Sequence, residues 1–193
     1  MTTTLDRAQE SAAAPTTKDA ESRKRFRRMA VEGVLFFVLA IGGGLLYWGG
    51  SFSHNMVHDQ LVDQKISFPA KGSAGFDAKE FPGLQRYAGQ AVDNGPKAKA
   101  FANQYIAAHL KSTNNGLTYS ETSAQSRANP TDAALKSKVE TLFRGETLRG
   151  LLLYAWGWSV VGSIALWTAY GAFVGALIVL AALIYSMVRP QHA

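Results

Sequence analysis

Hydrophobic and polar positions divide the chain into two long uncharged runs separated by a stretch of mixed composition. The first run, from Gly33 to Ser53, has 21 residues, and the second, from Gly150 to Val188, has 39. One helical crossing of a bilayer needs about 20 apolar residues. The first run therefore predicts a membrane-spanning helix over residues 29–50, and the second is about twice as long as one crossing requires.

The first run could instead be a secretory signal peptide. However, 32 mostly polar residues precede it, it is longer than a usual signal core, and no A-x-A site follows Tyr47-Trp48. The basic cluster Arg23-Lys24-Arg25-Phe26-Arg27-Arg28 lies just before the run. Because basic residues stay on the cytoplasmic side of a span, we expect an uncleaved span in the plasma membrane with a cytoplasmic N-terminus.

The second run can form two crossings or one long helix. Two crossings would need a tight turn near Gly157 or Gly162, in a run that contains no Asn, Asp or Pro. The backbone groups of such a turn would need partners close to lipid. The sequence therefore favours one helix over residues 150–188, which places the C-terminus in the cytoplasm.

This long helix is expected to extend beyond the lipid. Counting back about 24 residues from Arg189 at 1.5 Å each places the second span at about residues 164–188. Residues 150–163 then lie outside the hydrocarbon and carry apolar side chains on all sides of the helix. A helix that is apolar all round is buried, so the external segment or another subunit should cover it. The residues expected to make this contact are Tyr154, Trp156 and Trp158.

The segment between the runs, residues 51–149, predicts a mostly helical extracytoplasmic domain. We expect a helix over residues 96–111, because a proline suits its first turn. Residues 117–128 are polar and predict a loop. Asn129 and Pro130 then predict the cap and the first turn of the next helix.

The predicted fold is therefore an all-α membrane protein in which two transmembrane helices flank this domain, and the second span is continuous with a long extracytoplasmic helix. Residues 1–28 are rich in Thr, Ala, Ser and charge and predict a disordered cytoplasmic tail. Residues 189–193 form a second, short cytoplasmic tail.

Small residues in both runs predict a close contact between helices. Gly171 and Gly175 form a GxxxG pattern, which lets helix backbones approach closely in a membrane. We expect packing of the two spans or self-association, although glycine is common in membrane helices anyway. The matching residues of the first run are Ala40, Gly42, Gly43 and Gly44.

Two polar groups outside the spans are candidate sites. His54 and His58 stand four residues apart, a spacing that places both imidazoles on one helix face and suits a metal ion, but the third ligand of an HExxH-type site is missing. Arg144, Glu146 and Arg149 could bind a lipid phosphate. The alternatives are interfacial histidines that bind water and ordinary surface ion pairs.

Composition excludes several classes of function. The chain has no cysteine, which excludes disulfides and thiolate metal sites. Its net charge of +6 is spread along the chain apart from the basic cluster, whose position beside a span indicates lipid and not nucleic acid as its partner. No charge lies within either span, so a channel or transporter working alone is not expected. We expect no enzyme activity and no cofactor.

The stretches DQLVDQKISFPAKG and TLFRGETLRGLLLYAWGWS, set between two spans, resemble a family of small actinobacterial two-span membrane proteins of unknown function. The resemblance covers residues 30–188. Members are sometimes labelled aromatic ring-opening dioxygenases. A non-haem iron site needs a compact set of His and carboxylate ligands, and the few histidines here do not suggest one, so the resemblance implies no catalytic residue.

These patterns predict a non-enzymatic accessory or assembly subunit of a larger envelope or respiratory membrane complex. Its expected partners are membrane lipids and other membrane subunits or further copies of itself. The alternative is a membrane protein whose external domain binds a lipid or another small ligand, as a sensor or carrier.

Overall fold

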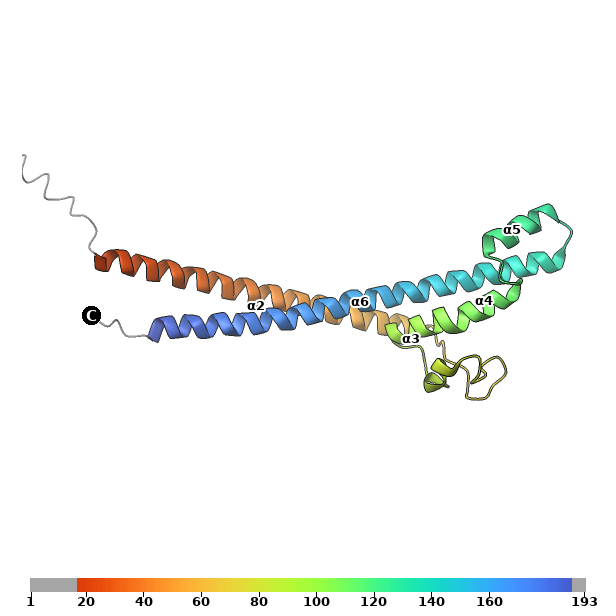
Figure 1. Ribbon diagram of the computed structural model, residues 1–193, viewed down its shortest axis with the longest axis horizontal. Coiled ribbons are helices and arrows are strands. Elements are labelled where there is room, and N and C mark those ends of the chain that lie inside the picture. The colour runs from red at the N-terminus through yellow and green to blue at the C-terminus, as the bar shows by residue number, and fades with distance from the viewer. Residues whose placement is uncertain (1–16, 189–193) are drawn as a thin grey trace, which may run out of the picture. The chain divides into compact units, whose positions relative to one another are not determined.

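The computed structural model describes residues 17–188, and Figure 1 labels the principal elements. There are two long helices, α2 (Thr17–Asp63) and α6 (Ala133–Val188). Several short helical elements lie between them in the sequence. The short elements are the 3₁₀ helix η1 (Pro82–Tyr87), α3 (Gly95–Ala100), the π-helix η2 (Phe101–Ile106), α4 (Ala107–Thr113) and α5 (Tyr119–Ala128). Residues 17–188 contain no strand, which confirms the all-helical class for this part of the chain.

Within the described residues, two helices are long and apolar enough to cross a membrane, as the hydrophobic pattern predicts. The most apolar 18-residue segment within Asp19–Asp63 has a mean hydropathy of 2.1, and that within Ala133–Val188 has 2.3. Only 6% of each segment is buried by the rest of the structure. A core helix of a soluble protein would be covered by its neighbours, whereas most of the surface of these two segments is not covered by the described residues.

Helix α6 settles the choice between one helix and two. It is continuous from Ala133 to Val188 and passes through Gly157 and Gly162 without a break. The alternative with a turn inside the long run is therefore wrong. Continuity follows from the absence of proline and of turn-forming residues in this stretch, because isolated glycines weaken a helix by only about 1 kcal/mol each.

The predicted tail is only partly observed. Residues 17–28 belong to helix α2, so the disorder predicted for residues 1–28 is wrong for them. Arginine and lysine favour helix, and the ion pair of Arg28 with Glu32, at 2.7 Å, adds a stabilising i,i+4 contact. The rest of this tail and the tail of residues 189–193 lie outside the described residues.

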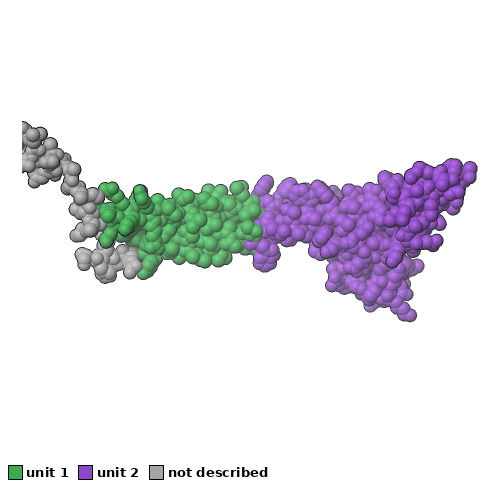
Figure 2. Space-filling model, turned by 45° about the horizontal axis from the view of Figure 1, so that its top comes forward, with its two compact units in different colours: residues 1–46, 168–193 green, residues 47–167 purple. Residues whose placement is uncertain are grey.

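The chain divides into two compact units, which Figure 2 distinguishes by colour. Unit 1 consists of residues 1–46 and 168–193, and unit 2 of residues 47–167. In unit 1, α2 and α6 run antiparallel, since Gly43 lies against Phe173 and Arg25 donates to the carbonyl of Ser186.

Unit 2 holds the hydrophobic core, which consists largely of aromatic side chains. Phe76 is fully buried, with its ring centroid 5.9 Å from that of Phe81 and 5.8 Å from that of Tyr105. Phe101 is 5.0 Å from Tyr105 and 5.1 Å from Phe68. These aromatic residues stand at scattered positions of a glycine-rich sequence, and they converge because helices α2 and α6 supply Val57, Leu61, Leu142 and Leu152 to the same cluster.

The helix predicted over residues 96–111 is confirmed, and it contains a π-helical stretch. It begins at Gly95, where the side chain of Asn94 accepts from the backbone N–H of Lys97 at 3.0 Å, and it ends at Thr113. The middle of it, Phe101–Ile106, is π-helical. A turn follows it, in which Asn115 and Gly116 both have positive φ.

The loop predicted for residues 117–128 is wrong, because helix α5 covers Tyr119–Ala128. Thr118 and Glu121 form a capping box, in which the Glu121 N–H donates to Thr118 Oγ1 and the Thr118 N–H donates to Glu121 Oε2 at 2.8 Å. This arrangement satisfies two backbone donors that would otherwise lack partners. The polar composition suggested a loop, whereas the T-x-x-E spacing is a helix start signal.

The start of α6 also differs from the prediction. Asp132, and not Asn129, accepts the backbone N–H of Leu135 at 2.9 Å. Asn129 instead ends α5, with its backbone N–H bonded to the carbonyl of Gln125. Pro130 therefore lies in the turn between the helices, and the first helical turn begins after Asp132.

The capping box gives a prediction about pH. The backbone and side-chain hydrogen bonds from Thr118 hold the pKa of Glu121 below its ordinary value of 4.5. Folding thus lowers this pKa, so the contribution of Glu121 to stability is present above pH 4.5 and is lost as the pH falls through the lowered value. An NMR titration of the Glu121 carboxyl should give a midpoint below 4.5.

Replacement of Thr118 by valine should move that midpoint upward, because the side-chain bond is lost. Replacement of Thr147, whose hydroxyl donates to Phe143, serves as a control that should leave it unchanged. A wild-type midpoint at or above the ordinary value would contradict the capping box in solution.

Candidate interaction face

The part of α6 expected to be covered on all sides is covered on one side only. Leu152 is 2% exposed, and Ser159, seven residues on, is also buried. In contrast, Leu151, Tyr154 and Trp158 are 62%, 65% and 40% exposed. Within this chain, the external elements pack against one face of the helix and leave the other face open. Cover of the open face by another subunit stays a prediction.

The open face has the spacing of a helix-packing stripe. We call Leu151, Tyr154, Trp158 and Val161 the aromatic stripe; its members are separated by three, four and three residues and lie on one side of a helix. The rings of Tyr154 and Trp158 meet edge to face with their centroids 6.1 Å apart. Anchors at this spacing are the ones by which one helix docks on another, and monomers rarely leave such a patch exposed.

A groove of about 400 Å³ lies beside the aromatic stripe, between α2 and α6 in unit 2. Helix α2 contributes Phe52 and Met56 to its wall, and α6 contributes Tyr154, Trp158 and Ala165. The hydroxyl of Ser53 lines the same groove but donates to the carbonyl of Trp158 at 2.8 Å, so it is already satisfied. Apart from Ser53 and Gln60 the lining is apolar, and the groove has the size that holds a small ligand.

Trp156, the third aromatic residue expected at a contact, does not belong to this face. Successive residues of an α-helix are rotated by about 100°, so Trp156 lies nearly opposite Tyr154 and Trp158. Its ring lies 4.1 Å from the Nζ atom of Lys99, which is on α3. The structure thus divides the predicted contact residues between two sides of α6.

The predicted phosphate site of Arg144 and Arg149 does not come together. Arg144 forms an ion pair with Glu140, and Arg149 pairs with Glu146 at 3.2 Å and donates to Asn103 Oδ1 at 3.3 Å. The two arginines thus have different partners. The alternative of surface ion pairs is the arrangement observed.

The two candidate metal ligands also have separate partners. His58 Nδ1 lies 2.9 Å from the carbonyl oxygen of Asp93, so this nitrogen carries the proton and donates. His54 Nε2 lies 3.2 Å from Ser163 Oγ, whose own proton is donated to the carbonyl of Ser159. Within residues 17–188, no group of three or more potential metal ligands is found.

Of the predicted small residues, Gly43 and Gly175 lie at the contact between α2 and α6. A Cβ added to Gly43 would be 3.0 Å from the ring of Phe173, and one added to Gly175 would be 3.4 Å from Leu39. Added Cβ atoms on Gly42, Gly44 and Gly171 would meet nothing within 4 Å. Ala40 is partly buried.

In unit 2, α2 and α6 approach one another closely at a glycine pair that the GxxxG pattern does not include. A Cβ on Gly50 would be 2.8 Å from the carbonyl oxygen of Gly162, and one on Gly162 would be 3.1 Å from the carbonyl of Gly50. On α2, Gly43 and Gly50 are seven residues apart. On α6, Gly162, Ala169 and Ala176 follow one another at the same interval, and all five residues are buried. A seven-residue period marks a coiled-coil seam, and this signal was available in the sequence.

Comparison of the chain with known protein families finds no matching model, and no curated protein or solved structure matches it. The resemblance to the actinobacterial family therefore stays a prediction that these comparisons do not support. Any functional argument must start from the residues themselves.

Proposed function

We propose that the protein is an integral membrane protein with two spans and with both ends in the cytoplasm. The two apolar helices and their lack of cover within the chain support membrane insertion. The basic residues at the start of α2 favour the cytoplasmic side. In unit 1, Arg25 donates to the carbonyls of Ser186 and Met187 at 2.8 and 3.2 Å, so the start of α2 lies beside the end of α6.

The extent of exposed apolar surface differs between the two helices. On α2, the exposed apolar side chains of the uncharged segment run from Val34 to Phe52, which is about 27 Å of helix at 1.5 Å per residue. Phe26, Val31 and Val62 are exposed outside this segment, among charged residues. On α6 the exposed apolar side chains run from Leu151 to Val188, which is about 56 Å. The hydrocarbon core of a bilayer is about 30 Å thick. The hydrocarbon core therefore matches the exposed uncharged segment of α2 in length, but only about half of the corresponding segment of α6.

From this excess length we propose that the protein is a non-enzymatic accessory subunit of a larger membrane complex. The aromatic stripe is the part of α6 that lipid does not cover, and it offers helix-spaced anchors. The proposed partner of the stripe is an apolar helix of another membrane subunit. This helix would cover the side chains of the stripe on the face that α6 leaves exposed. Tyrosine and tryptophan are enriched among the residues that carry most of the energy of such interfaces.

The mass of the protein after gentle extraction from its own membrane tests this proposal. The wild type should migrate in an assembly heavier than its own 20.8 kDa that contains a second polypeptide. Replacement of Tyr154 and Trp158 by alanine should release it as a single chain, because the two central anchors are lost. The matched control is Leu177→Ala, which shortens an equally exposed side chain within the proposed span.

Release by Leu177→Ala as well would show that the stripe has no special role. A wild type extracted only as a single chain, or an assembly that survives the double substitution, would contradict the proposal. Masses at whole multiples of the chain alone would indicate self-association in place of a second subunit.

The groove beside the stripe favours lipid or small-ligand binding as a second candidate function. Its apolar walls and volume of about 400 Å³ suit an acyl chain. In the same mass measurement, this function would appear as a lipid-sized increment on the single chain without a second polypeptide.

A further inference from the structure

A second recess in unit 2 carries cations in place of apolar anchors. It has a volume of about 360 Å³ and is lined by residues of η1, α3, η2 and α6. Trp156 forms one wall, and because this residue lies nearly opposite Tyr154 and Trp158, the recess is on the other side of α6 from the aromatic stripe. The recess is therefore separate from the proposed docking surface.

The two cations of the recess rest on aromatic rings and lack a counter-ion. The guanidinium of Arg86 lies 4.7 Å from the ring centroid of Tyr87, and Lys99 Nζ lies 4.1 Å from that of Trp156. Neither forms an ion pair within residues 17–188, whereas nearby Lys97 pairs with Asp93 at 3.1 Å. The recess therefore holds two positive charges that a ligand can neutralise.

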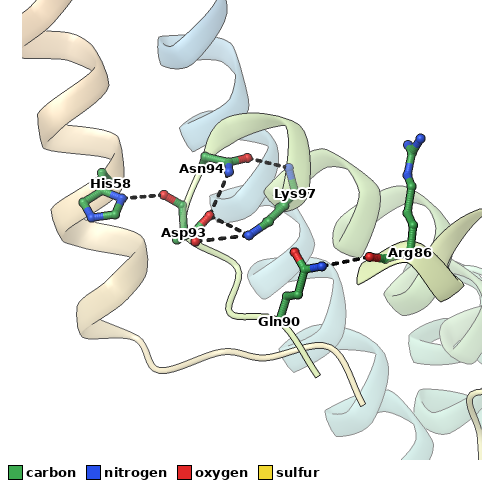
Figure 3. A network of polar contacts seen from close by, with 6 residues as sticks. All are labelled: His58, Arg86, Gln90, Asp93, Asn94 and Lys97. Carbon is green, nitrogen blue, oxygen red and sulfur yellow. Dashed lines mark hydrogen bonds and ion pairs between the residues drawn. The ribbon is translucent and has the colours of Figure 1, made fainter. Parts of the chain in front are cut away.

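Hydrogen bonds hold the chain around these cations in place. Figure 3 shows His58 bonded to the carbonyl of Asp93, whose carboxylate binds Lys97 and accepts from Asn94. In the same view Gln90 donates to the backbone carbonyl of Arg86 at 2.8 Å, while the guanidinium of Arg86 points away from the network. The network thus fixes the backbone and leaves this cation available.

Helix α3 is also held directly against α6. A Cβ on Gly95 would be 2.3 Å from Ser159 Cβ and 3.4 Å from the Cα atom of Trp156, so only glycine permits this approach. The close contact brings Lys99, one turn further along the helical segment, over the ring of Trp156. The two walls that carry Lys99 and Trp156 are therefore positioned by rigid elements.

The floor of the recess includes two amides from the π-helical stretch. Asn103 and Gln104 both line it and both belong to η2. Asn103 Oδ1 accepts from Arg149, which leaves the amide nitrogen of Asn103 as a donor. Stretches of π-helix are rare and are frequently found at functional sites. The π-helical stretch therefore supports a site here independently of the charges of Arg86 and Lys99.

We propose that this recess binds a phosphate ester. Arg86 and Lys99 would neutralise the phosphate oxygens, Asn103 would donate to one of them, and Trp156 would pack against the organic part of the ligand. Arginine matches the geometry of phosphate with two parallel hydrogen bonds. The phosphate can come from the headgroup of an anionic phospholipid or from a soluble ester, since both present the same group.

Titration of the full chain in detergent, followed by native mass measurement, tests the proposal with two probes. One arm uses phosphatidylglycerol and the other uses glycerol 3-phosphate. The wild type should bind at least one probe saturably. Arg86→Gln combined with Lys99→Gln should weaken that binding at least about tenfold, because two charge-assisted contacts are lost.

The control variant removes the same charge elsewhere in unit 2. Lys111 and Lys136 are exposed and lie outside the recess, so their replacement by glutamine should change binding less than about twofold. A third variant, Arg86→Lys with Lys99→Arg, keeps both charges and should bind within a few-fold of the wild type if its thermal midpoint is unchanged.

Each outcome decides the proposal. Saturable binding of phosphatidylglycerol alone identifies the lipid headgroup as the source, and binding of glycerol 3-phosphate identifies a soluble ester. Equal loss in the glutamine variant and in the control would show a general effect of charge and would overturn the proposal, as would the absence of wild-type binding in both arms.

Discussion

Replacing Gly50 by alanine is expected to be among the most damaging single-methyl additions in the chain. The added Cβ would lie 2.7 Å from Leu166 Cγ and 2.8 Å from the carbonyl oxygen of Gly162. A backbone oxygen cannot move aside as a flexible side chain can, so α2 and α6 must separate. Overpacking of this kind lowers the free energy of unfolding by about 1–3 kcal/mol. The variant should therefore have a lower midpoint of thermal unfolding in detergent.

The neighbouring residue provides the control for this experiment. A Cβ on Gly49 would meet nothing within 4 Å. Gly49→Ala should therefore raise the midpoint slightly, because alanine is favoured over glycine in a helix by up to about 1 kcal/mol. Equal midpoints for the two variants would contradict the close crossing of α2 and α6 at Gly50.

Truncation of Phe76 to alanine is expected to have the second large effect. The ring is fully buried between Phe81 and Tyr105, so its removal leaves a cavity within the aromatic core. Phenylalanine-to-alanine changes in cores cost about 3–5 kcal/mol. Near-ultraviolet circular dichroism during thermal unfolding should show an earlier loss of the aromatic signal.

Phe143→Ala is the matched control, because it removes the same ring from a position that is 56% exposed. The ring of Phe143 contacts that of Tyr119 at the surface, with 5.7 Å between the centroids. The free energy of unfolding should therefore fall by less than about 1 kcal/mol. A similar loss in both variants would mean that Phe76 is not packed in a core in solution.

The helices that local signals specify could be predicted from the sequence. The helix from Gly95 to Thr113 has a proline in its first turn, and the continuity of α6 follows from the lack of any breaker in its apolar run. Helix α5 was missed even though its signal is local, because the polar composition outweighed the Thr118 to Glu121 spacing. Local determinants therefore account for most of the secondary structure.

The exposure of individual residues on α6 could not be predicted in the same way. Residues 151–158 are apolar on every side, so their sequence does not say which side is covered. That choice depends on where distant elements pack, and Gly95, far away in sequence, lies against Ser159. The groove residues Phe52 and Met56 were missed for the same reason, since they face α6 only through the crossing of the two helices.

The recess of Arg86 and Lys99 shows the same limit for charged residues. In the sequence these two cations are ordinary surface residues, separated by 13 positions from one another and by more than 50 from Trp156. Tyr87 directly follows Arg86, but only the fold places the ring of Trp156 beside Lys99 and brings both cations to one recess. In contrast, Arg144 and Arg149 stand close in sequence, but each forms an ion pair with a nearby glutamate. These ion pairs neutralise the positive charges on which the predicted phosphate site depended.

The way in which α5 is attached has a consequence for how the domain fluctuates. Thr122 is the buried residue of this helix, and it accepts from the amide of Asn114, whose oxygen in turn accepts from Lys138 at 3.1 Å. Polar junctions of this kind open at a lower free energy than an apolar core does. We therefore expect helix α5 to open at a lower free energy than the aromatic core, so that it can detach while the rest of the domain stays folded.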